Sequence, residues 1–271
     1  MMNLFERNYL DGLTEREQEE YSDIIKQENA KANNRKFGRI ALLSKYPPAA
    51  RHYFSLFPNN HLDIYELKTA VNVDQTNEKF IDLVSDSSST ERDILRYINH
   101  TPAFHIIGSI LRGCSYRLGH HNAYLFPEFP LGTSYQADYL IVGNKSGGYE
   151  FVFVELEAPN GSITTNNGEL GTTFRKGIAQ VNNWNRWLQE NYGSLSEYFE
   201  KHIKHGDTLP REFVKYDSSR IHFVVVAGMR KDFSDTTYRI AREHRDKQNI
   251  QLLHYDNLYD FACEAPSFPT Y

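Results

Sequence analysis

The sequence lacks several features that would restrict the protein to other classes. It has only two cysteines, Cys114 and Cys263, and no Cys-x-x-Cys pair, which excludes a disulfide framework and favours a reducing cytosol. No apolar run approaches the roughly 20 residues that a membrane span needs, and no secretory signal pattern is present. The net charge of −5 gives no overall basic field, so any nucleic-acid binding needs a local patch. We expect a soluble, cytoplasmic protein with no membrane partner.

Aromatic residues, in contrast, are abundant, with 18 Tyr and 17 Phe among 271 residues. This composition argues against disorder, and the length suffices for one large domain or two modest ones. A polar, turn-forming stretch over residues 85–90 is the best linker in the chain. We therefore predict an amino-terminal module over residues 1–85 and a second domain over residues 86–271.

The amino-terminal part has signals for both helix and strand. Thr14-x-x-Glu17 is a capping-box pattern, which predicts a helix that runs towards residue 33. Residues 39–44 read as a short apolar strand, and residues 61–73 as another strand-rich segment. We expect these elements to form a small α/β module, whose function the sequence does not indicate.

The segment 136–159 is the most informative part of the chain, because it reads as a β-hairpin with acids at one end. A first apolar strand over residues 137–143 carries Asp138, and a second over 149–154 is followed by Glu155 and Glu157. A turn over residues 145–148 pairs residue 144 with residue 149, and this register places Asp138 opposite Glu155, with Cβ atoms about 5 Å apart. Glu155 and Glu157 then share that face, because side chains alternate along a strand.

Three crowded carboxylates repel one another, and a bound divalent cation is the usual compensation. This arrangement predicts a metal site formed by Asp138, Glu155 and Glu157. The alternative is a polar strand edge where the sheet frays into solvent, and a slip of one residue in the register would separate the acids.

Two predicted helices flank the hairpin in sequence. The first covers residues 91–99, and Glu91 lies on the same side as the buried stripe, so it either points inward or is a first-turn acid favoured by the helix dipole. The second covers residues 172–190 and presents Lys176 and Gln180 on one side. Strands over 221–228 and 250–254, with a charged helix between them, complete an alternating pattern around a mixed sheet.

This order of elements resembles the core of the PD-(D/E)XK nucleases, and within that superfamily it is most similar to the Shedu anti-phage defence nucleases. The resemblance covers roughly residues 91–260. The segments that carry it are the helix from Glu91 to Pro102, Gln136-Ala-Asp138, Val154-Glu-Leu-Glu-Ala-Pro159, Ala179-Gln180-x-x-x-Trp184, Ala227-Gly-Met-Arg230 and Tyr255-Asp-Asn-Leu258.

The resemblance implies a restriction-endonuclease-like mixed sheet flanked by helices, and a metal-dependent DNA endonuclease or nickase that acts against phage. Asp138 and Glu155 would be the metal-binding acids, Glu91 the first-helix acid, and Gln180 the residue that orients the acids or the substrate. The implied cofactor is Mg²⁺, with Mn²⁺ as a substitute. The implied partners are DNA and further copies of the chain, and the amino-terminal part would sense a trigger, assemble the oligomer or restrain cleavage.

The sequence departs from the superfamily pattern at Glu157, which occupies the place of the usual lysine. Glu157 could recruit a second metal ion, or Lys176 could supply the missing positive charge from the helix. A third interpretation is that cleavage has been lost. The rival hypothesis is therefore a catalytically inactive nuclease-fold protein that acts as a DNA-binding or scaffold component.

Other candidate residues have simpler interpretations. The pair His120-His121 resembles part of an HNH nuclease motif, but no second ligand set accompanies it, and a surface pair is the simpler interpretation. Trp184 and Trp187 could stack on bases, yet their helical spacing favours packing. Glu128 precedes the hairpin and is either another acid near the site or a loop residue.

Overall fold

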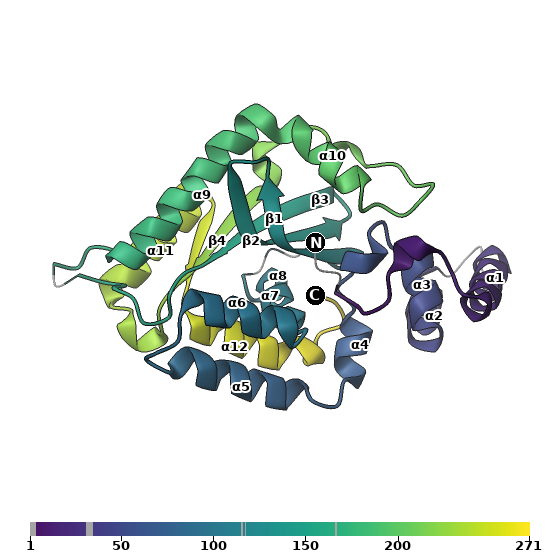
Figure 1. The fold of residues 1–271 in the computed structure, drawn as a ribbon, viewed down its shortest axis with the longest axis horizontal. Helices are drawn as coiled ribbons and strands as arrows, with labels where there is room; N and C mark the ends of the chain where they lie inside the picture. The colour runs from purple at the N-terminus through teal and green to yellow at the C-terminus, as the bar shows by residue number, and fades with distance from the viewer. Residues whose placement is uncertain (1–3, 31–34, 115, 117, 166) are drawn as a thin grey trace.

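The computed structural model describes residues 4–30, 35–114, 116, 118–165 and 167–271 (Figure 1). One five-stranded sheet is covered on both faces by helices, which confirms the expected mixed α/β architecture. The α-helices are α1 (Glu15–Ala30), α2 (Arg35–Lys45), α3 (Pro47–Phe54), α4 (Ile64–Thr69), α5 (Val73–Ser85), α6 (Glu91–His100), α7 (Phe104–Gly108), α8 (Ile110–Gly113), α9 (Thr172–Asn191), α10 (Leu195–Glu200), α11 (Asp235–Gln248) and α12 (Tyr255–Glu264).

The strands follow one another across the sheet in chain order. They are β1 (Asn122–Leu131), β2 (Tyr135–Lys145), β3 (Gly148–Leu156), β4 (Ile221–Val226) and β5 (Ile250–Leu253). The first three strands are antiparallel to one another, whereas β3, β4 and β5 are parallel. The parallel connections contain helices α9 and α11, as crossovers between parallel strands require.

The β2–β3 hairpin has the register that the sequence predicts. Asn144 pairs with Tyr149, and pairing continues to Lys145 and Gly148, so the turn is two residues shorter than the expected loop. Gly148 has φ of +99°, a conformation that favours glycine. The last paired residues at the other end are Tyr139 and Val154, so the same count places Asp138 opposite Glu155.

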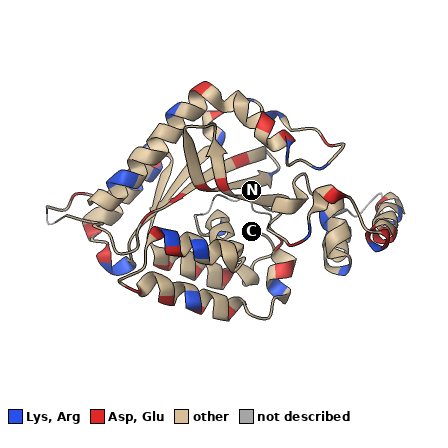
Figure 2. Ribbon diagram, in the orientation of Figure 1, with Lys and Arg blue, Asp and Glu red and all other residues tan. Residues whose placement is uncertain are grey.

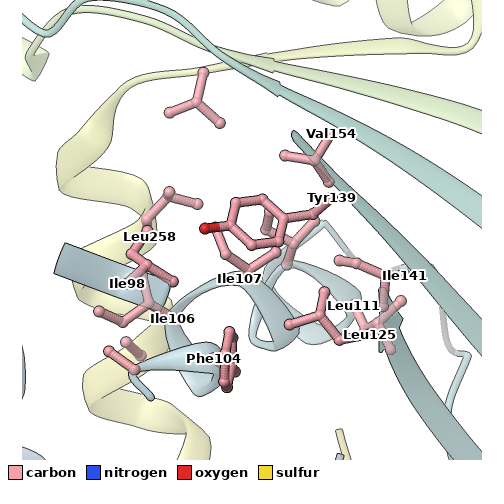
Figure 3. Close-up of a cluster of buried hydrophobic side chains, with 14 of the residues drawn as sticks. Ile98, Phe104, Ile106, Ile107, Leu111, Leu125, Tyr139, Ile141, Val154 and Leu258 are labelled. Carbon is pink, nitrogen blue, oxygen red and sulfur yellow. The ribbon is translucent and has the colours of Figure 1, made fainter. Parts of the chain in front are cut away.

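Side chains of β2 and β3 alternate between two hydrophobic cores. Tyr139, Ile141 and Val154 face the core beneath α6, α7 and α12, where they lie near Ile98 and Leu258 (Figure 3). Residues of the opposite parity, including Leu140, Val142, Phe151 and Phe153, face the core under α9 and α11. Glu155 has this second parity, whereas Ala137 and Tyr139 belong to opposite cores, so the simple alternation is interrupted around Asp138.

The strands expected over residues 39–44 and 61–73 are wrong, because these segments contain the helices α2 and α4. Short apolar runs of four or five residues do not distinguish strand from helix. Leu42 and Leu43 pack with Ile24 in a separate small core, and Asp63 caps α4 by accepting hydrogen bonds from the backbone of its first turn. The described residues before β1 form helices and one isolated β-bridge, so the amino-terminal module is not α/β.

Two helices, α1 and α6, begin with capping boxes. Thr14 and Glu17 make the two reciprocal hydrogen bonds of a capping box, at 3.3 and 2.7 Å, which confirms the helix start; its expected extension to residue 33 lies outside the described residues. Thr90 and Asp93 form a second capping box at the start of α6. Phe80 of α5 lies in the same core as Ile94 of α6, and a domain boundary near residue 85 stays a prediction.

Strand β1 was not expected, because Pro127 and Pro130 interrupt its pattern. It lies at the edge of the sheet, where proline is tolerated since one side of the strand needs no hydrogen-bond partner. Glu128 lies within this strand, is exposed and has φ of +51°. It is therefore a strand residue, not a loop residue. Among the described residues, no helix is long and apolar enough to cross a membrane.

Candidate active site

The three carboxylates of the hairpin lie near the start of β2 and the end of β3, which are adjacent because the strands are antiparallel. Glu155 and Glu157 are each only 2% exposed, while Asp138 is half-buried. The backbone N–H of Glu157 donates to the carbonyl oxygen of Val226 at 2.8 Å, so the chain continues alongside β4 after the last residue of β3. Red bands mark acids on the strands in the middle of the molecule (Figure 2). The acids therefore lie inside the protein, not at a frayed and solvated strand edge.

Hydrogen bonds satisfy only part of this acidic group. Asp138 Oδ2 accepts a hydrogen bond from the backbone N–H of Leu156 at 2.7 Å. Glu155 Oε2 and Glu157 Oε1 are buried and have no hydrogen-bond partner among the described residues. Unpaired buried oxygen atoms are costly, because such atoms lose their interaction with water without replacement. These two oxygen atoms could still bind a cation or accept a hydrogen bond from a donor group.

The same crowding changes how readily the acids ionise. Burial, and secondarily the negative charges of Asp138, Glu157 and Glu91, raise the pKa of Glu155 to about 10. Burial also raises the pKa of Asp138 to about 7, although the Leu156 hydrogen bond opposes the shift. The pKa of Glu157 is raised by burial despite the nearby Lys176. A cation close to these groups would stabilise their charged forms.

Lys176 on α9 reaches the acids from outside the sheet. Its Nζ atom lies 2.8 Å from Glu157 Oε2 and 3.5 Å from Glu91 Oε2. The side chain of Lys176 is 60% exposed and that of Glu91 is 33% exposed, so this ammonium group lies between solvent and the buried acids. Glu91 faces the site and not only the dipole of its own helix. The ammonium group lies beside Glu157. This is the position at which the resemblance described above implies a lysine.

A glycine in the middle of α9 allows this close approach. A Cβ atom on Gly177 would lie 2.5 Å from Val225 Cγ1 and 3.2 Å from Glu157 Cγ, so any larger residue would push the helix away from the sheet. No role was predicted for Gly177 from the sequence. A glycine within a helical pattern is itself a signal of close packing.

Tyr255 is a second residue whose position the sequence did not predict. This fully buried residue of α12 donates its hydroxyl hydrogen bond to the backbone carbonyl of Glu157 at 2.7 Å. The bond fixes the chain directly after β3, between the cores of the two sheet faces. Only the motif from Tyr255 to Leu258 indicated that this segment matters.

The remaining predicted residues differ in their burial and in the residues that they contact. Gln180 is one turn after Lys176 on the same side of α9 and is half-buried, and its predicted orienting role stays a prediction. Trp184 is fully buried in the core, and Trp187 packs close to Gly132, which favours packing over base stacking. His120 and His121 contact each other at the start of β1, with ring centroids 4.3 Å apart.

A family comparison can now be set beside this geometry. The model of "Shedu protein SduA, C-terminal" matches residues 88–259, which is more than half of the chain. The chain belongs to the Shedu family. The Shedu match begins just before Glu91 and ends just after Leu258, so it contains all six predicted site residues, and the amino-terminal helices lie outside it. A comparison with curated proteins gives no match.

The Shedu site was also tested for its chemical fit to a metal ion. Within the described ranges, no group of three or more His, Cys, Asp or Glu side chains is arranged to hold an ion as it stands. The donor set is nevertheless of the type that Mg²⁺ prefers, namely carboxylate oxygens, two of them buried without a partner. These two oxygen atoms belong to Glu155 and Glu157, whereas one oxygen of Asp138 already accepts the hydrogen bond from Leu156.

Proposed function

We propose that this Shedu protein is a metal-dependent DNA endonuclease or nickase that acts in defence against phage. The observation that carries the proposal is the buried acidic group at the start of β2 and the end of β3, in which Glu155 Oε2 and Glu157 Oε1 have no partner among the described residues. A structural role alone gives no reason to keep these oxygens buried and unpaired. Family membership supports the defence role.

Asp138 and Glu155 would hold Mg²⁺, which Mn²⁺ could replace. The bound ion would supply polarisation of the scissile phosphate and a lowered pKa of an attacking water. The backbone N–H of Leu156 fixes the orientation of Asp138 for this task. Glu157 would hold Lys176 in place through their 2.8 Å contact, and Gln180 would orient the acids or the substrate from the next turn of α9.

Lys176 is the residue that we propose replaces the missing lysine of the superfamily pattern. Its ammonium group is anchored by Glu157 and Glu91, and more than half of the side chain faces solvent, where a phosphate can approach. In this role Lys176 would stabilise the negative charge that develops during hydrolysis. In this proposal Glu157 positions a cation, so its presence at the lysine position is compatible with activity.

The DNA backbone would meet a local positive surface despite the net charge of −5. Arg92 and Arg96 on α6 and Arg175 on α9 are exposed on the two helices that supply Glu91 and Lys176, and Figure 2 shows the basic bands on both helices. Such a patch suffices for phosphate contacts, whose strength falls as salt is added. We further propose that the chain acts in the cytoplasm as a homo-oligomer, which light scattering would test.

The deciding experiment is a plasmid-nicking assay with Mg²⁺ or Mn²⁺. We expect nicking by the parent protein, none in EDTA, and a loss of at least about 100-fold in Asp138→Asn and Glu155→Gln, since even the supporting partners of metal ligands contribute 10- to 100-fold. Glu190→Gln, an exposed acid on α9, is the matched control and should cleave normally.

The rival function is DNA binding without cleavage, which Glu157 in the lysine place favours. Binding that needs no metal and leaves the plasmid intact, in a parent protein shown to be folded, would establish this rival. Nicking that survives in both Asp138→Asn and Glu155→Gln would mean that the acids named here do not carry the reaction.

A further inference from the structure

A cavity lies far from the acidic group, between the amino-terminal helices and the start of β1. Its volume is about 470 Å³, and its polar lining includes Arg39 of α2, His61 and Asp63 before α4, and Asn122. Asn122 pairs with Asn144, which lies six residues along β2 from Asp138, about 20 Å at 3.3 Å per residue. The cavity is therefore separate from the proposed nuclease site.

Arg39 is the charged residue of this cavity that makes no ion pair among the described residues; burial lowers its pKa and outweighs the opposite effect of Glu28, which is near enough to raise the pKa. Its guanidinium group donates to Asn122 Oδ1 and lies 5.1 Å from the ring centre of Phe54, and both partners are neutral. No ion pair joins Arg39 to a carboxylate of the described residues, and the residues outside the described ranges include no Asp or Glu. A half-buried guanidinium group in this situation favours an anion, since buried charges in proteins are normally paired.

His61 is a nearly buried part of the cavity wall. The residue is only 6% exposed, and its Nδ1 atom has no hydrogen-bond partner within the described part of the chain. Burial lowers the pKa of His61 to about 3, so the ring is neutral at physiological pH. Asp63, the acid of the lining, is already engaged by Arg51 and by the backbone at the start of α4.

The other walls are mainly apolar and aromatic. Leu43, Leu62, Ile64, Tyr65 and Tyr271 line the cavity, and its volume lies in the range of small-molecule sites, about 300–1,000 Å³. Such walls suit the ring of an organic ligand, while Arg39 suits its anionic group. A bare inorganic anion would leave most of this apolar surface without a contact.

We propose that this cavity binds a small organic phosphate with a planar ring, of which a nucleoside monophosphate is the chemical type. The phosphate pairs with the Arg39 guanidinium group, and the ring lies against the apolar walls. Arginine is well suited to this task because its planar fork of N–H groups matches phosphate oxygens.

The test is calorimetric titration of the full chain in EDTA with AMP, dTMP, inorganic phosphate and adenosine. We expect at least one of the two nucleotides to bind, and to bind more tightly than phosphate or adenosine. Arg39→Gln should weaken nucleotide binding at least about tenfold, the effect of removing one charged hydrogen-bond partner. Arg39→Lys should retain part of the affinity, while Arg96→Gln and Asp138→Asn, which leave this cavity intact, should bind like the parent.

Several results would overturn the proposal. Absence of binding by all four probes contradicts it, as does unchanged nucleotide affinity in an Arg39→Gln protein whose circular dichroism and Tm match the parent. Adenosine as tight as AMP would exclude phosphate recognition, and phosphate as tight as both nucleotides would exclude a role for the ring. If Arg39→Gln does not fold, Tyr65→Ala replaces it and should weaken AMP binding more than phosphate binding.

Discussion

Two clusters of charged side chains in this protein bury carboxylates, and they compensate the charge differently. In the first, Arg51 is 4% exposed and contacts Asp63 at 3.0 Å, Glu66 at 2.8 Å and the Tyr9 hydroxyl at 2.6 Å. In the second, at the end of β3, four carboxylates share a single ammonium group, and the lysine that carries it is largely exposed.

The pKa shifts of the two clusters reflect this difference. Burial alone would lower the pKa of Arg51, yet Tyr9, Glu66 and Asp63 together raise it, so the cluster stabilises its own charge. In the acidic group, burial and neighbouring acids act together to raise the pKa of Glu155. The first cluster is complete in charge, although Arg51 Nε has no hydrogen-bond partner among the described residues, whereas the second lacks positive charge, as a site for a cation would.

Removing the charge from the complete cluster should have the largest effect. Arg51→Met leaves Asp63 and Glu66 without their partner, and we expect the free energy of unfolding to fall by about 3–5 kcal/mol, as for other broken buried pairs. Urea denaturation followed by circular dichroism measures this change. Arg96→Met, an exposed control, should cost less than about 1 kcal/mol. Equal effects of the two substitutions would mean that the Arg51 cluster is not a structural anchor.

A smaller loss is expected where α9 approaches the acidic group. Gly177→Ala places a methyl group 2.5 Å from Val225 Cγ1, and the resulting displacement should cost about 1–3 kcal/mol. Nicking should fall as well, because α9 carries Lys176. A Cβ at Gly193 would meet no atom within 4 Å, so Gly193→Ala is the matched control and should leave nicking intact. Full nicking by Gly177→Ala would mean that catalysis does not depend on the close packing of α9 against the sheet.

The incomplete cluster should respond in the opposite direction, since Glu155→Gln should stabilise the metal-free protein on the order of 1 kcal/mol at pH 8. The folded protein holds the Glu155 proton up to pH about 10, whereas the unfolded chain releases it near 4.5. The folded state therefore binds more protons in this window, and stability falls as pH rises through it.

Urea midpoints at several pH values test this sign. In Glu155→Gln most of the decline with pH should disappear, leaving a smaller one between pH 3.8 and about 7 from Asp138. Glu190→Gln should keep the parent's pH profile. A difference in stability between the parent and Glu155→Gln that stays constant from pH 5 to pH 9 in EDTA would contradict the raised pKa of Glu155, and this comparison cancels the contribution of buried histidines such as His61 and His105.

Lys176 should contribute least to stability and more to activity. Its side chain is 60% exposed, so Lys176→Met should change the free energy of unfolding by less than about 1 kcal/mol. Nicking should nevertheless fall by about 100-fold if the ammonium group stabilises the transition state. Arg175→Met, the neighbouring exposed cation, should affect DNA affinity more than turnover. Unchanged turnover in Lys176→Met would remove the proposed replacement for the missing lysine.

The sequence by itself determined the features that depend on near neighbours. The caps at Thr14 and Thr90 use side chains and backbone groups three residues apart. The hairpin register follows from a short turn, and counting along it brings Asp138 opposite Glu155. The mixed sheet was also predictable, because a long periodic segment of the sequence indicates whether it forms a helix or a strand.

Only the tertiary structure decided the features that depend on distant contacts. Residues 39–44 and 61–73 contain helices because of the surfaces and caps that they meet, and β1 tolerates its prolines because it lies at the sheet edge. Lys176 could be proposed from the sequence, but its contact with Glu157 required α9 to pack closely at Gly177. Side chains far apart in the chain meet through the packing of whole elements, and local sequence patterns do not specify that packing.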